Sequence, residues 1–172
     1  FPEAIIRVDA NANMHYDAAL ALLKKLEPFG LDAAEQMVPM WDLDGLADLA
    51  RRVDIAMMAD ECVATAQDLL EVIKRRAATV VQTKIARHGG IWHIRNLWTI
   101  ARLVVDHHAD VYRYAYRLAG SAVDAEDLTQ QTFLAAQLKL EQLRSPESAR
   151  AWLFTILRNC YLKSRRRRRS GW

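Results

Sequence analysis

Four short apolar runs recur along the first half of the chain, and each is followed by apolar residues at helical spacing. The runs are AIIRVDA, AAEQMV, DIAMMADE and ATVVQTKIA. Runs of this length, rich in β-branched or apolar residues, are typical of strands. Regular alternation of strand and helix predicts parallel strands joined by right-handed helical crossovers, either in an open α/β sheet or in part of a barrel.

A polar residue closes each of these runs, and the four recur at a nearly constant interval. Asp9, Glu35, Asp60 and Lys84 are separated by 26, 25 and 24 residues. In a (β/α) barrel the carboxyl ends of the strands converge on the catalytic face. Three carboxylates there form an all-oxygen site suited to Mg²⁺, and a neighbouring lysine can remove a proton α to a carboxylate. The spacing therefore favours a partial (β/α) barrel of about four βα units.

Four segments, RVDANAN, AEQMVP, MADE and KIARHGGI, resemble the barrel domain of the enolase superfamily in its muconate-lactonizing and mandelate-racemase branch. The resemblance covers about residues 1–101. It implies a magnesium site with Asp9, Glu35 and Asp60 as the metal ligands. It also implies that Lys84 is the catalytic acid/base and that Asn11 and Gln36 are supporting polar groups.

Much of that family's chain has no counterpart in this sequence. The capping domain, the early strands with their own lysine and the last two strands of the barrel are missing. Four strands cannot close a barrel of eight, so we expect this half not to turn over substrate by itself. Its open edges would favour self-association. Because the chain starts at Phe1 instead of Met, we expect a fragment or a processed product.

The second half of the chain is predicted to be an all-α helical bundle over residues 102–172. Apolar residues keep helical spacing from Leu97 to Leu118, and Gly120 is a suitable stop. Asp124 with Asp127 indicates a capped start for a second helix that ends near Leu143. Ser145 and Pro146 indicate the start of a third helix.

Charge separates the two halves. Residues 1–101 hold 11 basic and 14 acidic side chains, whereas residues 102–172 hold 13 and 7. The net charges are therefore −3 and +6. Most of the basic excess follows Leu143 and ends in the run Arg165 to Arg169, which favours polyanion binding or, more simply, a solvated tail.

Two segments of this half, VYRYAYRLAGSAVDAEDLTQQTFLAAQ and ARAWLFTILRNCYLKSRRRR, resemble region two of a bacterial sigma factor of the extracytoplasmic-function type. The resemblance implies that the core RNA polymerase is a partner, contacted at its β′ subunit by Asp127, Gln130 and Gln131. It also implies promoter DNA as a partner, with the −10 element on the third helix and the loop before it, and no cofactor. The DNA-contacting residues would then be Arg158, Asn159, Lys163, Arg165 and Arg166.

The cysteines and histidines match no metal-ligand spacing. Cys62 and Cys160 lie far apart, so we expect buried, reduced thiols. His107 and His108 are neighbours on one expected helix and point in different directions, which argues against a zinc site. No apolar run is long enough to cross a bilayer, and the N-terminus has no signal-peptide pattern, so a cytoplasmic protein without membrane contact is expected.

Two functions from different classes are compatible with this sequence. The first is a transcription initiation module that carries an enolase-like half barrel. The second is a Mg²⁺-dependent enzyme of the enolase superfamily, a dehydratase, racemase or cycloisomerase, present as a truncated fragment. We favour the first, because the region-two bundle is nearly complete whereas half a barrel lacks closure and a cap.

Overall fold

The structure is a computed structural model that describes residues 4–169, with side chains described from residue 4 to residue 166. The chain divides into two compact units, Phe1–Ile91 and Trp92–Trp172. The expected boundary at residues 101 and 102 lies inside a long helix, α4 (Ile91–Ala119).

The first unit is an α/β structure built on a four-stranded parallel sheet. Its elements run β1 (Arg7–Asp9), α1 (Tyr16–Leu26), a 3₁₀ turn η1 (Glu27–Phe29), β2 (Ala33–Glu35), α2 (Leu43–Arg52), β3 (Ala56–Ala59), α3 (Ala66–Arg75) and β4 (Val80–Val81). The expected alternation of strand and helix is therefore confirmed. The strands lie in the order β1-β2-β3-β4, and every pair is parallel.

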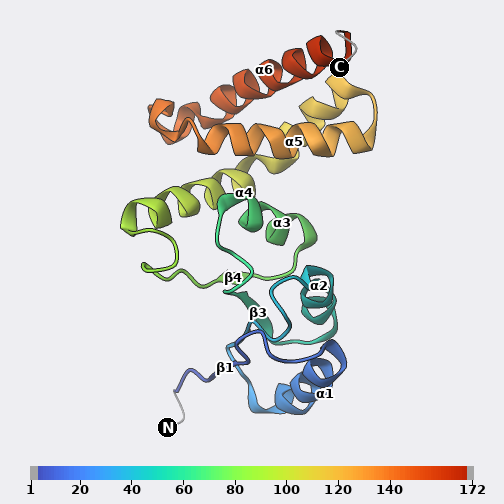
Figure 1. Ribbon diagram of the computed structural model, residues 1–172, viewed down its shortest axis with the longest axis vertical. Helices are drawn as coiled ribbons and strands as arrows, with labels where there is room; N and C mark the ends of the chain where they lie inside the picture. The colour runs from blue at the N-terminus through green and yellow to red at the C-terminus, as the bar shows by residue number, and fades with distance from the viewer. Residues whose placement is uncertain (1–3, 170–172) are drawn as a thin grey trace. The chain divides into compact units, whose positions relative to one another are not determined.

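The sequential strand order places the connecting helices together. Figure 1 shows α1, α2 and α3 along the same side of the strands. Right-handed crossovers between successive neighbouring strands produce this arrangement, whereas a doubly wound sheet reverses its order at a switch point. The described strands show no such reversal.

Local signals explain where the helices of this unit begin. The Asp42 carboxylate accepts a hydrogen bond from the Gly45 amide at 2.9 Å and so caps α2. Thr65 and Asp68 form a reciprocal capping box at the start of α3. Apolar residues of these helices are buried against the sheet, in which Met57 and Met58 of β3 are also buried. The core of the unit therefore centres on β3.

The second unit is helical, as expected. It contains α4, α5 (Ala122–Gln137), two 3₁₀ turns, η2 (Leu140–Gln142) and η3 (Pro146–Ser148), and α6 (Ala149–Arg169). Figure 1 shows α5 and α6 running side by side, and these helices make extensive contacts. Buried apolar residues from all three helices form its core, among them Val111, Phe133, Leu153 and Leu157.

The structure corrects two details of α5. Its N-cap is Ser121, whose hydroxyl accepts from the Asp124 amide at 3.1 Å, so the cap lies three residues before the expected one. The helix ends at Gln137 and not near Leu143. Leu138 is 85% exposed, so no apolar burial offsets the cost of extending the helix past it.

The start of α6 also differs slightly from the expected start at Ser145 and Pro146. The turn η3 contains Pro146, and α6 itself starts at Ala149. None of the helices in the described part of the chain is both long enough and apolar enough to cross a membrane.

Candidate carboxylate–lysine site and polar helix faces

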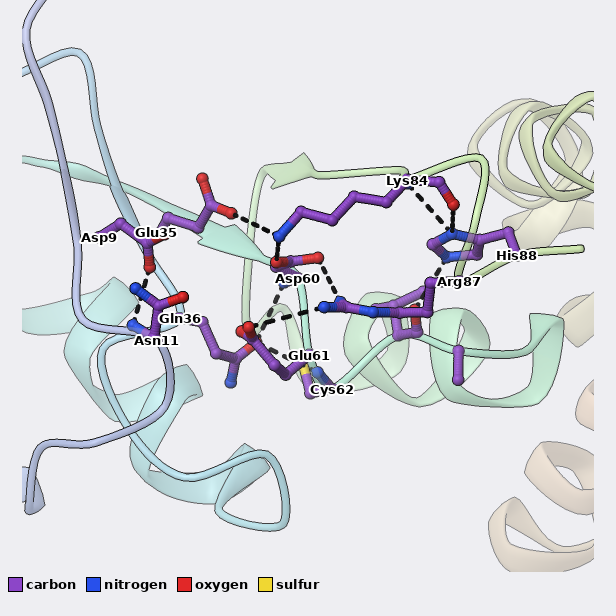
Figure 2. Close-up of polar contacts among 12 residues, drawn as sticks. Asp9, Asn11, Glu35, Gln36, Asp60, Glu61, Cys62, Lys84, Arg87 and His88 are labelled. Carbon is purple, nitrogen blue, oxygen red and sulfur yellow. Dashed lines mark hydrogen bonds and ion pairs between the residues drawn. The ribbon is translucent and has the colours of Figure 1, made fainter. Parts of the chain in front are cut away.

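The four polar residues predicted to form a site lie at the carboxyl ends of four adjacent strands. Asp9 and Glu35 are the last residues of β1 and β2 and are paired in the sheet register. Asp60 directly follows β3, and Lys84 follows β4 in the next loop. Figure 2 shows Glu35, Asp60 and Lys84 pointing toward one another. The parallel sheet therefore gathers residues that are far apart in the sequence.

Asp60 is the centre of this cluster. Its side chain is 1% exposed, and its two oxygens accept from the Lys84 ammonium and the Arg87 guanidinium. The Lys84 Nζ atom also lies 3.8 Å from Glu35 Oε1. A buried carboxylate needs such partners, because an uncompensated charge is costly in the protein interior.

Arg87 was not among the residues predicted from the sequence. It reaches Asp60 and also lies 3.6 Å from Glu61, measured from Nη2 to Oε1. The other Glu61 oxygen is buried without a hydrogen-bond partner. A cation three residues after Lys84, in the segment KIARHGG, was the only signal for Arg87 in the sequence.

Gln36 connects β2 to the loop after β3. Its side chain is fully buried, and its Oε1 atom accepts from the amides of Asp60 at 3.0 Å and Cys62 at 3.2 Å. Its amide nitrogen donates to the Val38 carbonyl at 3.1 Å. Gln36 adopts a φ of 34°, a strained conformation that these three bonds hold in place. It therefore positions the backbone that carries Asp60.

Asn11 lies in the turn after β1. Its backbone amide donates to the Asp9 carboxylate at 2.8 Å, and its φ is 47°. Asparagine tolerates this left-handed conformation better than most residues. The turn orients Asp9 at the edge of the cluster.

His88 has a structural role in the loop that carries Lys84. Its ring is buried, with Nε2 3.0 Å from the Val63 carbonyl and Nδ1 2.9 Å from the Lys84 carbonyl. The ring thereby ties the loop after β4 to the loop after β3. Within the described residues, no group of three histidine, cysteine or acidic side chains is arranged to hold a metal ion.

Electrostatics keep a positive charge on the lysine. The hydrogen bond to Asp60 raises the pKa of Lys84. Burial, reinforced by the charges of Asp9 and Asp60, raises the pKa of Glu35. The carboxylate oxygens are the donors that Mg²⁺ prefers, but both oxygens of Asp60 are bonded to cationic side chains. While these two pairs are in place, Asp60 is not available to a metal ion.

Both cysteines are free. Cys62 is buried as expected, whereas Cys160 is only half-buried, so the expectation of burial is wrong for Cys160. Burial raises the pKa of Cys62 to about 11.

The residues predicted to contact a polymerase lie on the outer face of α5. Asp127 and Gln131 are exposed, and Gln130 is half-buried, whereas Thr129 and Thr132 face the core. Asp127 and Gln131 also line a depression between α5 and α6 together with Tyr161 and Arg165. The structure thus brings two of the predicted polymerase contacts next to one of the predicted DNA contacts.

The predicted DNA contacts all belong to α6. Arg158, Asn159, Lys163, Arg165 and Arg166 are exposed. The Arg165 guanidinium lies 5.9 Å from the centre of the Tyr161 ring. The expected run of arginines continues to Arg169, but the side chains of residues 167–169 lie outside the described part of the chain.

Comparisons with known proteins bear on both units. The family model of the enolase C-terminal domain-like proteins matches residues 1–122. This chain belongs to that family. Residues 103–171 match the model of sigma-70 region 2, so the two matched ranges overlap over residues 103–122. The two resemblances expected from the sequence are confirmed.

Similar proteins support the first assignment. Muconate cycloisomerase 1 of Rhodococcus opacus is 38% identical over 100 residues, which are 58% of this chain and 27% of that protein. The crystal structure of a mandelate racemase/muconate lactonizing family protein from Azoarcus sp. EbN1 has a TM-score of 0.57 at 35% identity, over 60% of this chain and 28% of that one. An L-talarate dehydratase from Polaromonas sp. JS666, solved in complex with Mg and L-glucarate, has a TM-score of 0.52 at 28% identity. The match covers 57% of this chain and 27% of that one. The chain therefore spans little more than a quarter of these relatives.

Proposed function

We propose that the chain acts as a transcription initiation module of the sigma-factor type, in which the helical unit binds core RNA polymerase and the promoter −10 element. The match of residues 103–171 to sigma-70 region 2 carries this proposal. The enolase-like unit is then a passenger that does not turn over substrate alone.

The outer face of α5 supports the polymerase contact. Asp127 and Gln131 are exposed on a helix whose opposite face is buried, so their side chains are available to a partner. Neither residue is needed to start the helix, since Ser121 supplies the cap. A polar, exposed pair with no structural task is a reasonable docking element.

The exposed side of α6 supports the DNA contact. Arginine and lysine side chains there can neutralise phosphates, and the amide of Asn159 can reach base edges. At a melted promoter one strand leaves the duplex. The ring of Tyr161, which lies near the Arg165 guanidinium, can then stack on an unpaired base.

The test is capture of core polymerase by the full chain. We expect the wild-type chain to bind core polymerase, and we expect the double variant Asp127→Ala/Gln131→Ala to lose binding by tenfold or more. The variant Glu141→Ala, which removes an exposed acid beyond the end of α5, is the matched control and should bind as the wild type does. Failure of the wild-type chain to capture the polymerase would refute the proposal.

A second candidate function concerns the first unit, for which we propose a partial (β/α) barrel with residual enolase-type chemistry. Its support is the meeting of Asp9, Glu35, Asp60 and Lys84 at adjacent strand ends, and the Mg bound by the similar L-talarate dehydratase. For Lys84 to accept a proton, its ammonium must first release one and leave Asp60.

This candidate has its own measurement. The purified chain would be incubated with an acid sugar in deuterated water, with and without Mg²⁺, and α-proton exchange would be followed by NMR. Exchange that requires Mg²⁺ and disappears in Lys84→Met would establish it. A melting temperature that Mg²⁺ raises in the wild type but not in Asp60→Ala would show a metal site. If Mg²⁺ changes neither α-proton exchange nor the melting temperature, both the residual chemistry and the metal site are rejected.

A further inference from the structure

The four-stranded sheet of the first unit has an open edge at β1. In the described part of the chain, β1 pairs only with β2. The Ile6 carbonyl accepts from the Asp32 amide at 2.9 Å, so the backbone groups of Ile6 face β2. Backbone groups of alternate residues face opposite sides of a parallel strand, and those of Arg7 and Asp9 therefore face the open edge.

The other edge of the sheet, at β4, is open in the same way. The Thr79 amide donates to the Met57 carbonyl of β3 at 3.1 Å, so the backbone groups of Val80, one residue later, face away from β3. An open edge presents donors and acceptors to a further strand. Each copy of the chain thus offers two edges at which another strand can pair.

Apolar side chains remain exposed at both edges. Ile5 and Ile6, directly before β1, are 73% and 53% exposed. Val80 is 36% exposed, and Ile85, in the loop after β4, is 59% exposed. Parallel sheets are normally covered, and an exposed β-branched run at a sheet edge favours pairing with another chain. These side chains are therefore available to a partner that supplies a strand.

A second copy of this chain suits both edges at once. The helices α1, α2 and α3 lie along one side of the strands, as they do in the wall of a (β/α) barrel (Figure 1). Two four-stranded sheets related by a two-fold axis supply the eight strands of such a barrel, with β4 of each copy beside β1 of the other. Because this arrangement leaves no edge open, association stops at two copies.

The sheet register indicates which residues would meet. Asp9, Glu35, Met58 and Val80 form one row of Cα partners across the four strands. In a barrel of eight strands with a shear of about eight, such a row shifts by about four residues over four strands. The row that leaves β4 at Val80 therefore meets β1 of the second copy about four residues away from Asp9.

The site residues give the direction of this shift. Asp60 lies two residues beyond the row on β3, and Lys84 lies four residues beyond it on β4, although both point into the same cluster. Residues at one height of the wall therefore lie further along each successive strand. Continued by one strand, this trend places Lys84 beside Asp9 of the second copy and Val80 opposite Ile5 of the second copy.

Charges at the two edges are complementary. Asp9 is exposed, and in the part of the chain that the structure describes its carboxylate accepts only from the Asn11 amide, at 2.8 Å. The side chains of Lys84 and Arg87, after β4, are 41% and 30% exposed. One edge thus ends in an acid and the other in two cations, which favours contact between unlike edges.

We propose that two copies of this chain form a two-fold symmetric dimer in which β4 of each copy pairs with β1 of the other. Val80 then packs against Ile5 of the second copy, and Lys84 lies beside Asp9 of the second copy. Each carboxylate–lysine cluster thereby receives a residue from the other chain, and both clusters lie at the same end of one barrel. The dimer does not depend on polymerase or DNA binding by the helical unit.

Sedimentation equilibrium of the full chain tests the dimer. We expect a species of twice the chain mass, and Ile5→Lys should raise its dissociation constant by about tenfold or more, because a charge would then face Val80. Val105→Lys is the matched control, since Val105 is also 73% exposed but lies on α4 and belongs to neither edge strand. Its dissociation constant should stay within about twofold of the wild type.

Cysteine cross-linking tests the register. Ile5→Cys/Val80→Cys should form a covalent dimer under mild oxidation, whereas neither single variant should, because equivalent residues lie on opposite sides of the barrel. Within one copy the two positions lie on the outer strands, about 14 Å or more apart, which is too far for a disulfide. The wild type, oxidised in parallel, accounts for any reaction of Cys62 and Cys160.

Four results would overturn the proposal. They are a wild-type chain that stays monomeric at about 100 μM, an open-ended series of larger species in place of a dimer, equal dissociation constants of Ile5→Lys and Val105→Lys, and no covalent dimer of the double cysteine variant. Circular dichroism of each variant checks that its secondary structure is intact.

Discussion

Replacing Arg87 tests whether the Asp60 cluster stabilises the first unit. Asp60 is a buried carboxylate with two cationic partners, Lys84 and Arg87. Arg87→Ala removes one of them and leaves the other in place. A hydrogen bond to a charged group contributes about 1.5–3 kcal/mol, and loss of all compensation for a buried ion costs about 3–5 kcal/mol. Because Lys84 remains, we expect a loss near the lower range, about 2 kcal/mol.

A matched arginine isolates the effect of the partner's burial. Arg75 has a side-chain exposure of 38%, close to the 30% of Arg87, but its partners Asp44 and Glu71 are 86% and 27% exposed, against 1% for Asp60. Exposed ion pairs contribute about 0.2–1 kcal/mol, so Arg75→Ala should cost at most about 1 kcal/mol. The difference between the two variants then reports the burial of Asp60.

Hydrogen exchange followed by mass spectrometry provides the assay. Peptides that cover β3 and the amide of Asp60 report local opening of this unit, without requiring the whole chain to unfold in one step. A cost of about 2 kcal/mol corresponds to roughly 30-fold faster exchange. The double variant Asp60→Asn/Arg87→Ala should exchange no faster than Asp60→Asn alone, since the pair acts as a unit. Equal effects of Arg87→Ala and Arg75→Ala, or additive effects in the double variant, would refute this reasoning.

Three further predictions concern titration, reactivity and capping. Because the folded state raises the pKa of Glu35, the unfolded state releases this proton first, so stability should fall as pH rises from the ordinary glutamate range through the raised value; urea titrations at stepped pH should show a shallower fall in Glu35→Gln. With the pKa of Cys62 at about 11, alkylation by iodoacetamide at pH 8 should be roughly a hundredfold slower in the native chain than in urea, and equal rates would contradict burial of the thiol. Ser121→Ala removes the cap of α5 and should cost about 1 kcal/mol by urea unfolding of the helical signal, whereas Ser121→Asn should retain most of the stability.

Local pattern was enough to predict the elements and part of the site. The apolar runs marked each strand of the first unit, and the polar residue that ends each run marked its carboxyl end. Since parallel strands align these ends, the sequence alone was enough to predict that Asp60 and Lys84 lie close together. The N-cap of α5 was harder to predict, because Ser121 and Asp124 are both residue types that favour a helix start. Only the path of the backbone selects Ser121.

The sequence by itself determined the order of strands and helices, the two family resemblances and the four residues at the strand ends, because these depend on periodicity and on spacing along the chain. Only the tertiary structure decided which cations neutralise Asp60, how Gln36 holds the loop beside it, and that Ile5 and Val80 remain exposed at the sheet edges. Arg87 lies 27 residues from Asp60, and Gln36 lies 24 from it. Contacts over such separations depend on how the elements pack, and no local pattern along the chain records that packing.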